Sequence, residues 1–181
     1  MTETYIALLR GINVSGQKKI KMADLRNHLQ ELPYSNIQTY IQSGNIVFQH
    51  EATSLSEIEK AISNKIAEKY GFEVPTLVLA AASLQTILVN CPFSPAKGQD
   101  IERIYFTLLA EEPAADRLAA LAEFDYSPER YELLGKTIYF YAPNGYGRAK
   151  MNNNFFENQL KVHATTRNWK TVNMLVEMAG L

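Results

Sequence analysis

The stretch Tyr5-Ile6-Ala7-Leu8-Leu9 decides the fold, because a second stretch of similar make, Ile104-Tyr105-Phe106-Thr107-Leu108-Leu109, follows in the other half of the chain. Both are apolar and rich in residues that favour β-strands. Each is followed by an amphipathic helix, two strands joined by a tight glycine hairpin, another helix, a last strand and a closing helix. A β-α-β-β-α-β-α order that occurs twice indicates an internal duplication.

The expected fold class is therefore α+β, with two ferredoxin-like β-α-β-β-α-β units whose sheets are mainly antiparallel and whose helices pack on one face. Residues 90–102 are rich in proline, glycine and polar residues that end helices and strands, so they mark the boundary between the units. We expect a first unit over residues 1–90, a linker over residues 91–102 and a second unit over residues 103–181. A chain of 181 residues suits one ordinary domain or two small ones.

Local signals place the first elements after the opening strand. Apolar residues at helical spacing predict a helix that begins at Met22 and that Pro33 stops. Residues 37–42 alternate between apolar and polar side chains, as expected for a strand with one face on the core. A hairpin at Ser43-Gly44-Asn45 connects them to a returning strand over residues 46–48, because these residues tolerate positive φ.

The second helix of the first half carries a capping-box spacing at Ser54 and Glu57, and Gly71 is placed to cap its C-terminus. Its expected buried stripe consists of Leu55, Ile58, Ile62, Ile66 and Tyr70. The strand over residues 74–79 contains Pro75, which cannot donate to a ladder, so this strand belongs at a sheet edge. The strand order 4-1-3-2 puts it there.

In the second half, the pattern predicts a helix that opens near Pro113, strands over residues 129–134 and 137–142, and a helix over about residues 153–161. A short strand over residues 162–165 then precedes the last helix. Thr165 or Thr166 would cap the start of that helix. Trp169 lies on its apolar face and is interpreted as a core anchor.

Composition is that of a soluble globular protein, with 46% hydrophobic and 20% charged residues and a net charge of −1. No signal peptide and no membrane-spanning stretch are expected. The only cysteine, Cys91, cannot form an internal disulfide, which favours a cytoplasmic location. Both ends of the chain are basic and the middle is acidic. This asymmetry is typical of a surface that meets an anion, or of two parts of one fold that attract each other.

Three stretches together carry a family resemblance: Leu8-Leu9-Arg10-Gly11-Ile12-Asn13-Val14, Tyr40-Ile41-Gln42-Ser43-Gly44-Asn45 and Thr165-Thr166-Arg167-Asn168-Trp169-Lys170-Thr171. They resemble the bacterial family catalogued as domain of unknown function 1697. The resemblance implies a duplicated ferredoxin-like fold in a cytoplasmic bacterial protein, and it brings no activity to transfer. Ser15 departs from the glycine that is common at that place in the family.

The first candidate binding site is the loop over residues 10–21 together with the hairpin at residues 43–45. Gly11 and Gly16 have the spacing of a P-loop, but Gln17 and Lys18 stand where a P-loop requires Lys and Ser or Thr, so a nucleotide hydrolase is excluded. The loop remains either a solvated basic loop or an anion site before a helix. Topology brings its candidate ligands to one edge of the sheet, and these are Arg10, Asn13, Lys18, Lys19, Ser43 and Asn45. Plain turn chemistry is the alternative for the hairpin.

Two further basic segments precede helices in the second half and complete the candidate site. Arg148 and Lys150 lie in the segment over residues 144–154, and Arg167 and Asn168 lie in the segment over residues 165–170. Capping and core packing explain each segment taken alone. Three basic helix starts in one small chain favour an anionic partner.

An aromatic pattern in the second half offers another possible function. Simple alternation places Ile104, Phe106, Ile138 and Phe140 on one sheet face and Tyr105, Tyr139 and Tyr141 on the other. RNA-recognition modules stack bases on such an open face. An interface, between the units or across a possible homodimer, is the favoured alternative because tyrosine is common at interfaces.

Catalytic signatures are few, so the sequence leaves open whether the protein is an enzyme. His28, His50 and His163 lack metal-ligand spacing, and we expect no metal and no cofactor. The predicted function is the binding of an anionic ligand, a phosphate- or carboxylate-bearing small molecule or a nucleic acid, without a membrane partner. The alternatives are a nucleic-acid-binding module that uses the open sheet face and a non-enzymatic protein that forms interactions or oligomers.

Overall fold

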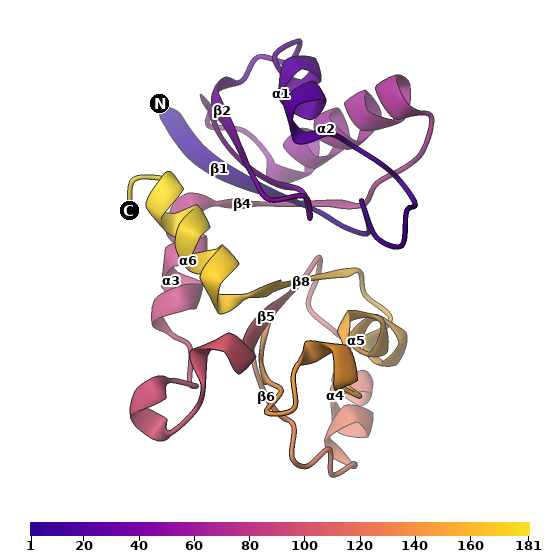
Figure 1. Cartoon of the computed structure of the whole chain (residues 1–181), viewed down its shortest axis with the longest axis vertical. Coiled ribbons are helices and arrows are strands. Elements are labelled where there is room, and N and C mark those ends of the chain that lie inside the picture. The colour runs from indigo at the N-terminus through magenta and orange to yellow at the C-terminus, as the bar shows by residue number, and fades with distance from the viewer. The chain divides into compact units, whose positions relative to one another are not determined.

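The computed structural model describes all 181 residues, and their contacts divide the chain into two compact units. Unit 1 comprises Met1–Thr86 and returns at the other end of the chain with Met174–Leu181. Unit 2 comprises Ile87–Asn173. Figure 1 shows the helices and strands of both units along the chain.

Unit 1 has the expected β-α-β-β-α-β order, followed by a helix: β1 (Thr2–Leu9), α1 (Met22–Leu29), β2 (Ser35–Tyr40), β3 (Asn45–Glu51), α2 (Leu55–Tyr70), β4 (Thr76–Ala80) and α3 (Ala81–Val89). The strands form one antiparallel sheet in the order β2-β3-β1-β4. Helices α1 and α2 pack on one face of this sheet (Figure 1).

Unit 2 repeats this order: β5 (Ile104–Leu109), α4 (Ala115–Ala122), β6 (Arg130–Leu134), β7 (Thr137–Tyr141), α5 (Asn153–Leu160), β8 (Ala164–Asn168) and α6 (Trp169–Met178). Its antiparallel sheet has the strand order β6-β7-β5-β8, which corresponds strand for strand to unit 1. The predicted α+β class is confirmed. The matching orders are consistent with duplicated units.

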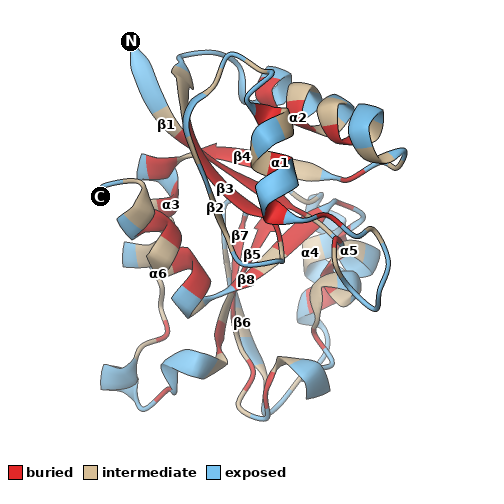
Figure 2. Cartoon of the chain, turned by 45° about the horizontal axis from the view of Figure 1, so that its top comes forward, coloured by how far each residue is buried: buried red, intermediate tan, exposed pale blue.

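The core of unit 1 lies between the sheet and its two helices. The central strands of this sheet are largely buried (Figure 2). Tyr5 and Phe48 are buried on them, and their rings stack at a centroid distance of 5.9 Å. Helix α2 begins as predicted, because Ser54 Oγ accepts a hydrogen bond from the Glu57 N–H at 3.4 Å. Gly71 caps its other end in the left-handed conformation. Leu55 was wrongly expected in the buried stripe: it is the first residue of the helix and is 41% exposed.

The start of the last helix was also predicted wrongly. Thr165 and Thr166 lie in strand β8, paired with Leu108 and Thr107 of β5, and therefore cap no helix. The β-branched threonines favour a strand, and pairing with the central strand determines the outcome. The N-terminal turn of α6 is instead stabilised by Asn168, whose Oδ1 accepts from the Thr171 N–H at 2.8 Å.

The predicted tyrosine face does not exist as a set of three, because the register of β5 and β7 is offset by one residue from simple alternation. Phe106 pairs with Tyr139 and Tyr105 pairs with Phe140, so Tyr105 lies on the helix-covered face with Phe140. Tyr139 is 2% exposed, and its hydroxyl donates to the carbonyl of Ile87 at 3.0 Å. Burial raises the pKa of Tyr139 to about 12.

At three of the four sheet edges, a side-chain contact or an irregularity of the strand prevents pairing with a further strand. At β4, the Glu59 carboxylate from α2 accepts the N–H of Val78 at 2.9 Å. At β8, the Glu157 carboxylate from α5 accepts the N–H of Ala164 at 2.9 Å. Strand β2 is irregular, because its register with β3 shifts between Ser35 and Gln38. Natural sheets use such blocked or irregular edges to prevent pairing with other chains.

Glu31, just after α1, receives two ammonium groups from α2: Lys69 Nζ at 2.8 Å and Lys65 Nζ at 3.1 Å. The hydrogen bond from Lys69, followed by that from Lys65, lowers the pKa of Glu31 to about 2. The lowered folded-state pKa gives stability that is present above the ordinary glutamate pKa of about 4.3 and is lost as the pH falls towards 2. Glu31→Gln should therefore flatten the acid side of the melting-temperature profile.

The matched control for this prediction is Glu51→Gln, which removes an exposed carboxylate at the end of β3 that forms no ion pair. Melting temperatures measured by circular dichroism between neutral pH and the acid limb should converge for the wild type and Glu31→Gln as the pH falls. The Glu51→Gln profile should stay parallel to the wild type. A parallel profile for Glu31→Gln would show that these ion pairs are too screened by solvent to affect stability.

Candidate functional site

The first candidate site lies where β1 ends in unit 1. The Leu9 N–H donates to the carbonyl of Gly44 at 2.8 Å, and the Arg10 N–H donates to the carbonyl of Pro75 at 3.0 Å. The loop after β1 therefore lies beside the β2–β3 hairpin on one side and beside the entry to β4 on the other. Arg10 in this loop and the hairpin residues Ser43 and Asn45 thus lie at the same end of the sheet.

Asn13 and Lys18 hold this loop in place. Asn13 Nδ2 donates to the carbonyls of Ile20 at 2.9 Å and Gln42 at 2.8 Å, while its Oδ1 accepts the Ile20 N–H at 2.9 Å. Lys18 Nζ donates to the carbonyl of Glu73 at 2.6 Å. The amide of Asn13 thus closes the loop on itself and on the hairpin, and Lys18 ties it to the segment before β4.

The polar side chains of the hairpin also form hydrogen bonds within the protein. Asn45 is fully buried, and its Nδ2 donates to the carbonyl of Tyr40 at 2.9 Å and to Ser43 Oγ at 3.0 Å. Of the cations predicted in unit 1, Arg10 is half-buried, whereas Lys19 is exposed and its side chain makes no hydrogen bond or ion pair within the protein.

The second candidate site, in unit 2, contains a chain of polar contacts that joins β5, β8 and the start of α5. Thr107 Oγ1 and Thr166 Oγ1 are 2.8 Å apart, and Thr166 Oγ1 donates to Asn153 Oδ1 at 2.8 Å. Asn153 Nδ2 in turn donates to the carbonyl of Ala164 at 3.1 Å. The hydroxyl of Tyr146, in a short 3-10 helix (Tyr146–Arg148), accepts the Asn153 N–H at 2.8 Å.

Arg167 is the next residue of β8 and lies opposite Phe106 in the β5–β8 ladder, so its side chain extends from the opposite face of the sheet to that of Thr166. It is 9% exposed, and its Nη1 donates to the carbonyl of Thr166 at 3.0 Å. Burial lowers the pKa of Arg167 to about 10, and the neighbouring Tyr146 opposes that shift. The guanidinium thus remains charged at neutral pH.

The backbone donors that were expected to hold an external anion in unit 2 are occupied by the protein itself. The carboxylate of Glu129 accepts the N–H groups of Lys150 at 2.8 Å and Met151 at 2.9 Å. Asn152 Oδ1 caps α5 by accepting the Phe155 N–H at 3.0 Å. The side chains of Arg148 and Lys150 are exposed and form no ion pair. Any external anion would meet side-chain cations here rather than helix N-termini.

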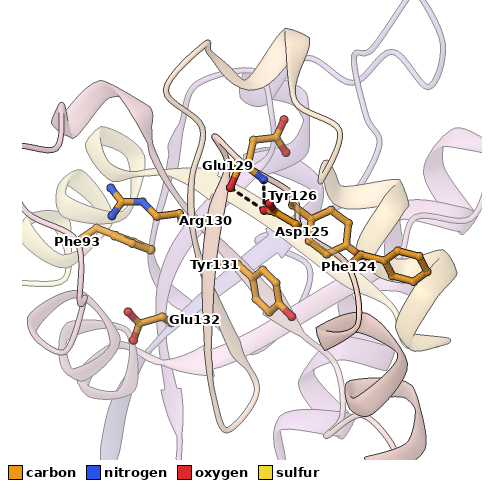
Figure 3. A pocket seen from close by; sticks show the side chains of 9 residues that line it. Phe93, Phe124, Asp125, Tyr126, Glu129, Arg130, Tyr131 and Glu132 are labelled. Atoms are coloured by element: carbon orange, nitrogen blue, oxygen red, sulfur yellow. Dashed lines mark hydrogen bonds between the residues drawn. The ribbon is translucent and has the colours of Figure 1, made fainter.

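A pocket of about 320 Å³ lies along β6, and sequence reasoning missed it. It is lined by Arg130, Tyr131, Glu132 and Glu129 of the strand region, and by Phe93 and residues 124–127 (Figure 3). The Arg130 guanidinium lies over the rings of Phe93 and Tyr141, at 5.7 and 5.2 Å from their centroids. In the sequence, the only indication of this pocket is a charged pair, Arg130 and Glu132, on a short alternating strand.

The Asp125 side chain in this pocket is also engaged internally. Its Oδ1 accepts from Ser127 Oγ at 2.6 Å and from the Ser127 N–H at 2.9 Å, which lowers the pKa of Asp125 (Figure 3).

Cys91, which does not line this pocket, is not an activated nucleophile. Burial raises the pKa of its thiol, so the reactive thiolate is disfavoured at neutral pH. No group of three or more His, Cys, Asp or Glu side chains is arranged to hold a metal ion.

Comparisons with known proteins bear on the whole chain. The model of a family described as protein of unknown function (DUF1697) matches residues 1–139. The solved structure of conserved bacterial protein SP0830 from Streptococcus pneumoniae is similar over 99% of both chains, with 26% sequence identity and a TM-score of 0.77. The search of curated proteins found no match. None of the helices is both long enough and apolar enough to cross a membrane.

Proposed function

We propose that this chain, which belongs to the DUF1697 family of proteins of unknown function, binds an anionic ligand that carries a phosphate or carboxylate group. The observation that carries the proposal is that Arg167 keeps its charge although its side chain is almost fully buried. The planar fork of donors of a guanidinium suits carboxylate and phosphate oxygens.

Tyr146 is close enough to Arg167 to influence its pKa, and its phenol can donate a hydrogen bond to a ligand. Arg148 ends the 3-10 helix that begins with Tyr146, and Lys150 follows it closely. Their exposed cations add positive charge on the segment that carries Tyr146. In unit 1, Arg10 and Lys19 are proposed as further cationic contacts for an anion.

A small anion is favoured over nucleic acid as the ligand. The three-tyrosine platform that would have stacked bases is absent, because Tyr105 faces the helices and Tyr139 is buried. Nucleic-acid binding through the basic loops alone would be dominated by phosphate contacts and would fall steeply with added salt. Salt dependence therefore distinguishes the two ligand classes.

Binding should be measured by calorimetric titration of inorganic phosphate, citrate and a single-stranded oligonucleotide at low and moderate salt. We expect citrate or phosphate to bind the wild type. Replacing Arg148 and Lys150 together by alanine should weaken that binding up to roughly tenfold, because exposed ion pairs contribute about 0.2–1 kcal/mol each and about 1.4 kcal/mol corresponds to a factor of ten. Arg167→Lys, which keeps the charge but loses the fork, should weaken it at least as much.

Arg117→Ala is the matched control, since Arg117 is an exposed arginine of unit 2 on α4 without an ion pair. It should bind like the wild type, and circular dichroism should show that every variant is folded. Equal affinity of all variants would remove these residues from the site. Tight, strongly salt-dependent binding of the oligonucleotide alone would replace the small anion by nucleic acid.

A further inference from the structure

Strand β6 differs from the other three edge strands because nothing blocks it. The β4 and β8 edges are occupied by Glu59 and Glu157, and β2 is irregular. By contrast, β6 pairs with β7 in an unbroken register, and no segment outside the sheet hydrogen-bonds to its backbone. An exposed regular edge is a template for another strand.

The hairpin determines which backbone groups of β6 face outwards. Leu134 and Thr137 close the two-residue turn at Gly135-Lys136, and such closing residues exchange both hydrogen bonds with each other. Arg130, Glu132 and Leu134 therefore direct their backbone groups towards β7. Tyr131 and Leu133 direct theirs to the free edge, where a further strand would pair.

We propose that this edge pairs with the same edge of a second copy of the chain, antiparallel and centred on Tyr131. In that register each Tyr131 lies opposite the other copy's Tyr131 as a hydrogen-bonded pair. Arg130 of each copy then lies opposite Glu132 of the other, in the non-hydrogen-bonded positions where side chains are closest. The strand is thus complementary to itself in charge.

Neighbouring registers are disfavoured by the same charges. Outward-facing residues must pair with outward-facing residues, so the register shifts in steps that keep this parity. A shift of the partner strand by two residues in one direction places Glu132 opposite Glu132. The same shift in the other direction places Arg130 opposite Arg130. Like charges directly opposite destabilise a strand pair. Only the arrangement centred on Tyr131 pairs opposite charges twice.

The groove along β6 is shaped for this partner. Arg130 and Glu132 lie on one side of the strand and Tyr131 on the other, as Figure 3 shows. Arg130 is held in place by its contacts with Phe93 and Tyr141, so little side-chain freedom is lost on pairing. Two apolar side chains nearby are exposed: Phe124, which lines the pocket, is 63% exposed, and Leu134, the last residue of β6, is 59% exposed. A second copy would remove part of this surface from water.

The test uses two charge-reversal variants of the full chain, Arg130→Glu and Glu132→Arg, in sedimentation equilibrium over a range of concentrations. The wild type should form a dimer reversibly. Each variant alone places like charges opposite each other twice, so its dissociation constant should rise roughly ten- to hundredfold. When the two variants are mixed, every pair is Glu opposite Arg again, and the heterodimer should form with near wild-type affinity.

The mixing experiment also excludes misfolding as the cause, because two misfolded variants would not recover a dimer together. Glu112→Arg, a charge reversal at an exposed site before α4, should dimerise like the wild type. A wild type that stays monomeric at the highest soluble concentration would overturn the proposal. So would a dimer that both single variants form unchanged. Neither Arg130 nor Glu132 belongs to the proposed anion site, so the two proposals succeed or fail independently.

Discussion

Gly44→Ala is expected to lower the free energy of unfolding by about 2–4 kcal/mol, since overpacking and a strained backbone act at the same residue. A Cβ at this position would lie 2.7 Å from both Leu9 Cβ and Ile12 Cδ1. Gly44 also has φ +82, a conformation that alanine adopts only at a cost. Leu9 is part of the central strand β1, so it cannot move aside without disturbing the sheet. Urea denaturation measures the change.

Gly16→Ala separates the two causes. Gly16 has a similar φ of +75, but a Cβ there would meet nothing within 4 Å. Its replacement should therefore cost only the conformational part, about 1 kcal/mol. If both substitutions lower the free energy of unfolding equally, the loop beside Gly44 relaxes to make room for the added methyl group. Overpacking against Leu9 and Ile12 would then contribute nothing to the loss.

Glu129→Ala is expected to destabilise the protein by about 2–4 kcal/mol, because it leaves two backbone N–H groups without their charged acceptor. These groups belong to Lys150 and Met151, and Met151 is fully buried. Water can reach the Lys150 N–H more easily than that of Met151, so the buried donor accounts for most of the loss. The midpoint of urea unfolding should fall with the slope of the transition unchanged.

The matched control is Glu123→Ala, which removes an exposed glutamate after α4 whose side chain forms no hydrogen bond or ion pair. It should change stability by no more than about 0.5 kcal/mol. A small effect of Glu129→Ala would mean that the segment before α5 finds other partners for its N–H groups. The carboxylate would then be dispensable for the fold of unit 2.

The sequence predicted the parts of the fold that depend on nearby residues. Ser54 and Gly71 delimit α2 as predicted, and β4 is an edge strand as predicted, although it begins at Thr76 and so excludes Pro75, which was expected within it. The start of α6 was wrong, since Thr165 and Thr166 are drawn into β8 by pairing with a strand distant in sequence. The tyrosine face was wrong for the same kind of reason: register between β5 and β7 is a tertiary property.

The candidate site was predictable in residue type but not in role. Asn13, Lys18 and Asn45 have the polar groups that an anion site needs, yet the structure uses those groups to bind backbone carbonyls. Glu129 reaches the segment before α5 across 22 residues, a distance over which the sequence carries no periodic signal. Arg167 was singled out as part of a basic helix start, whereas it lies in strand β8, and this place in the strand accounts for its burial. Its role in binding remains a proposal.

The discontinuity of unit 1 has a consequence for biosynthesis. Unit 1 begins the chain but is completed by Met174–Leu181, after all of unit 2 has been synthesised. On the ribosome, residues 1–86 emerge first and include the whole core between the sheet and its two helices, whereas their contacts with residues 174–181 form later. The first part of unit 1 to be translated therefore meets its last part only after the continuous piece over residues 87–173 has been made.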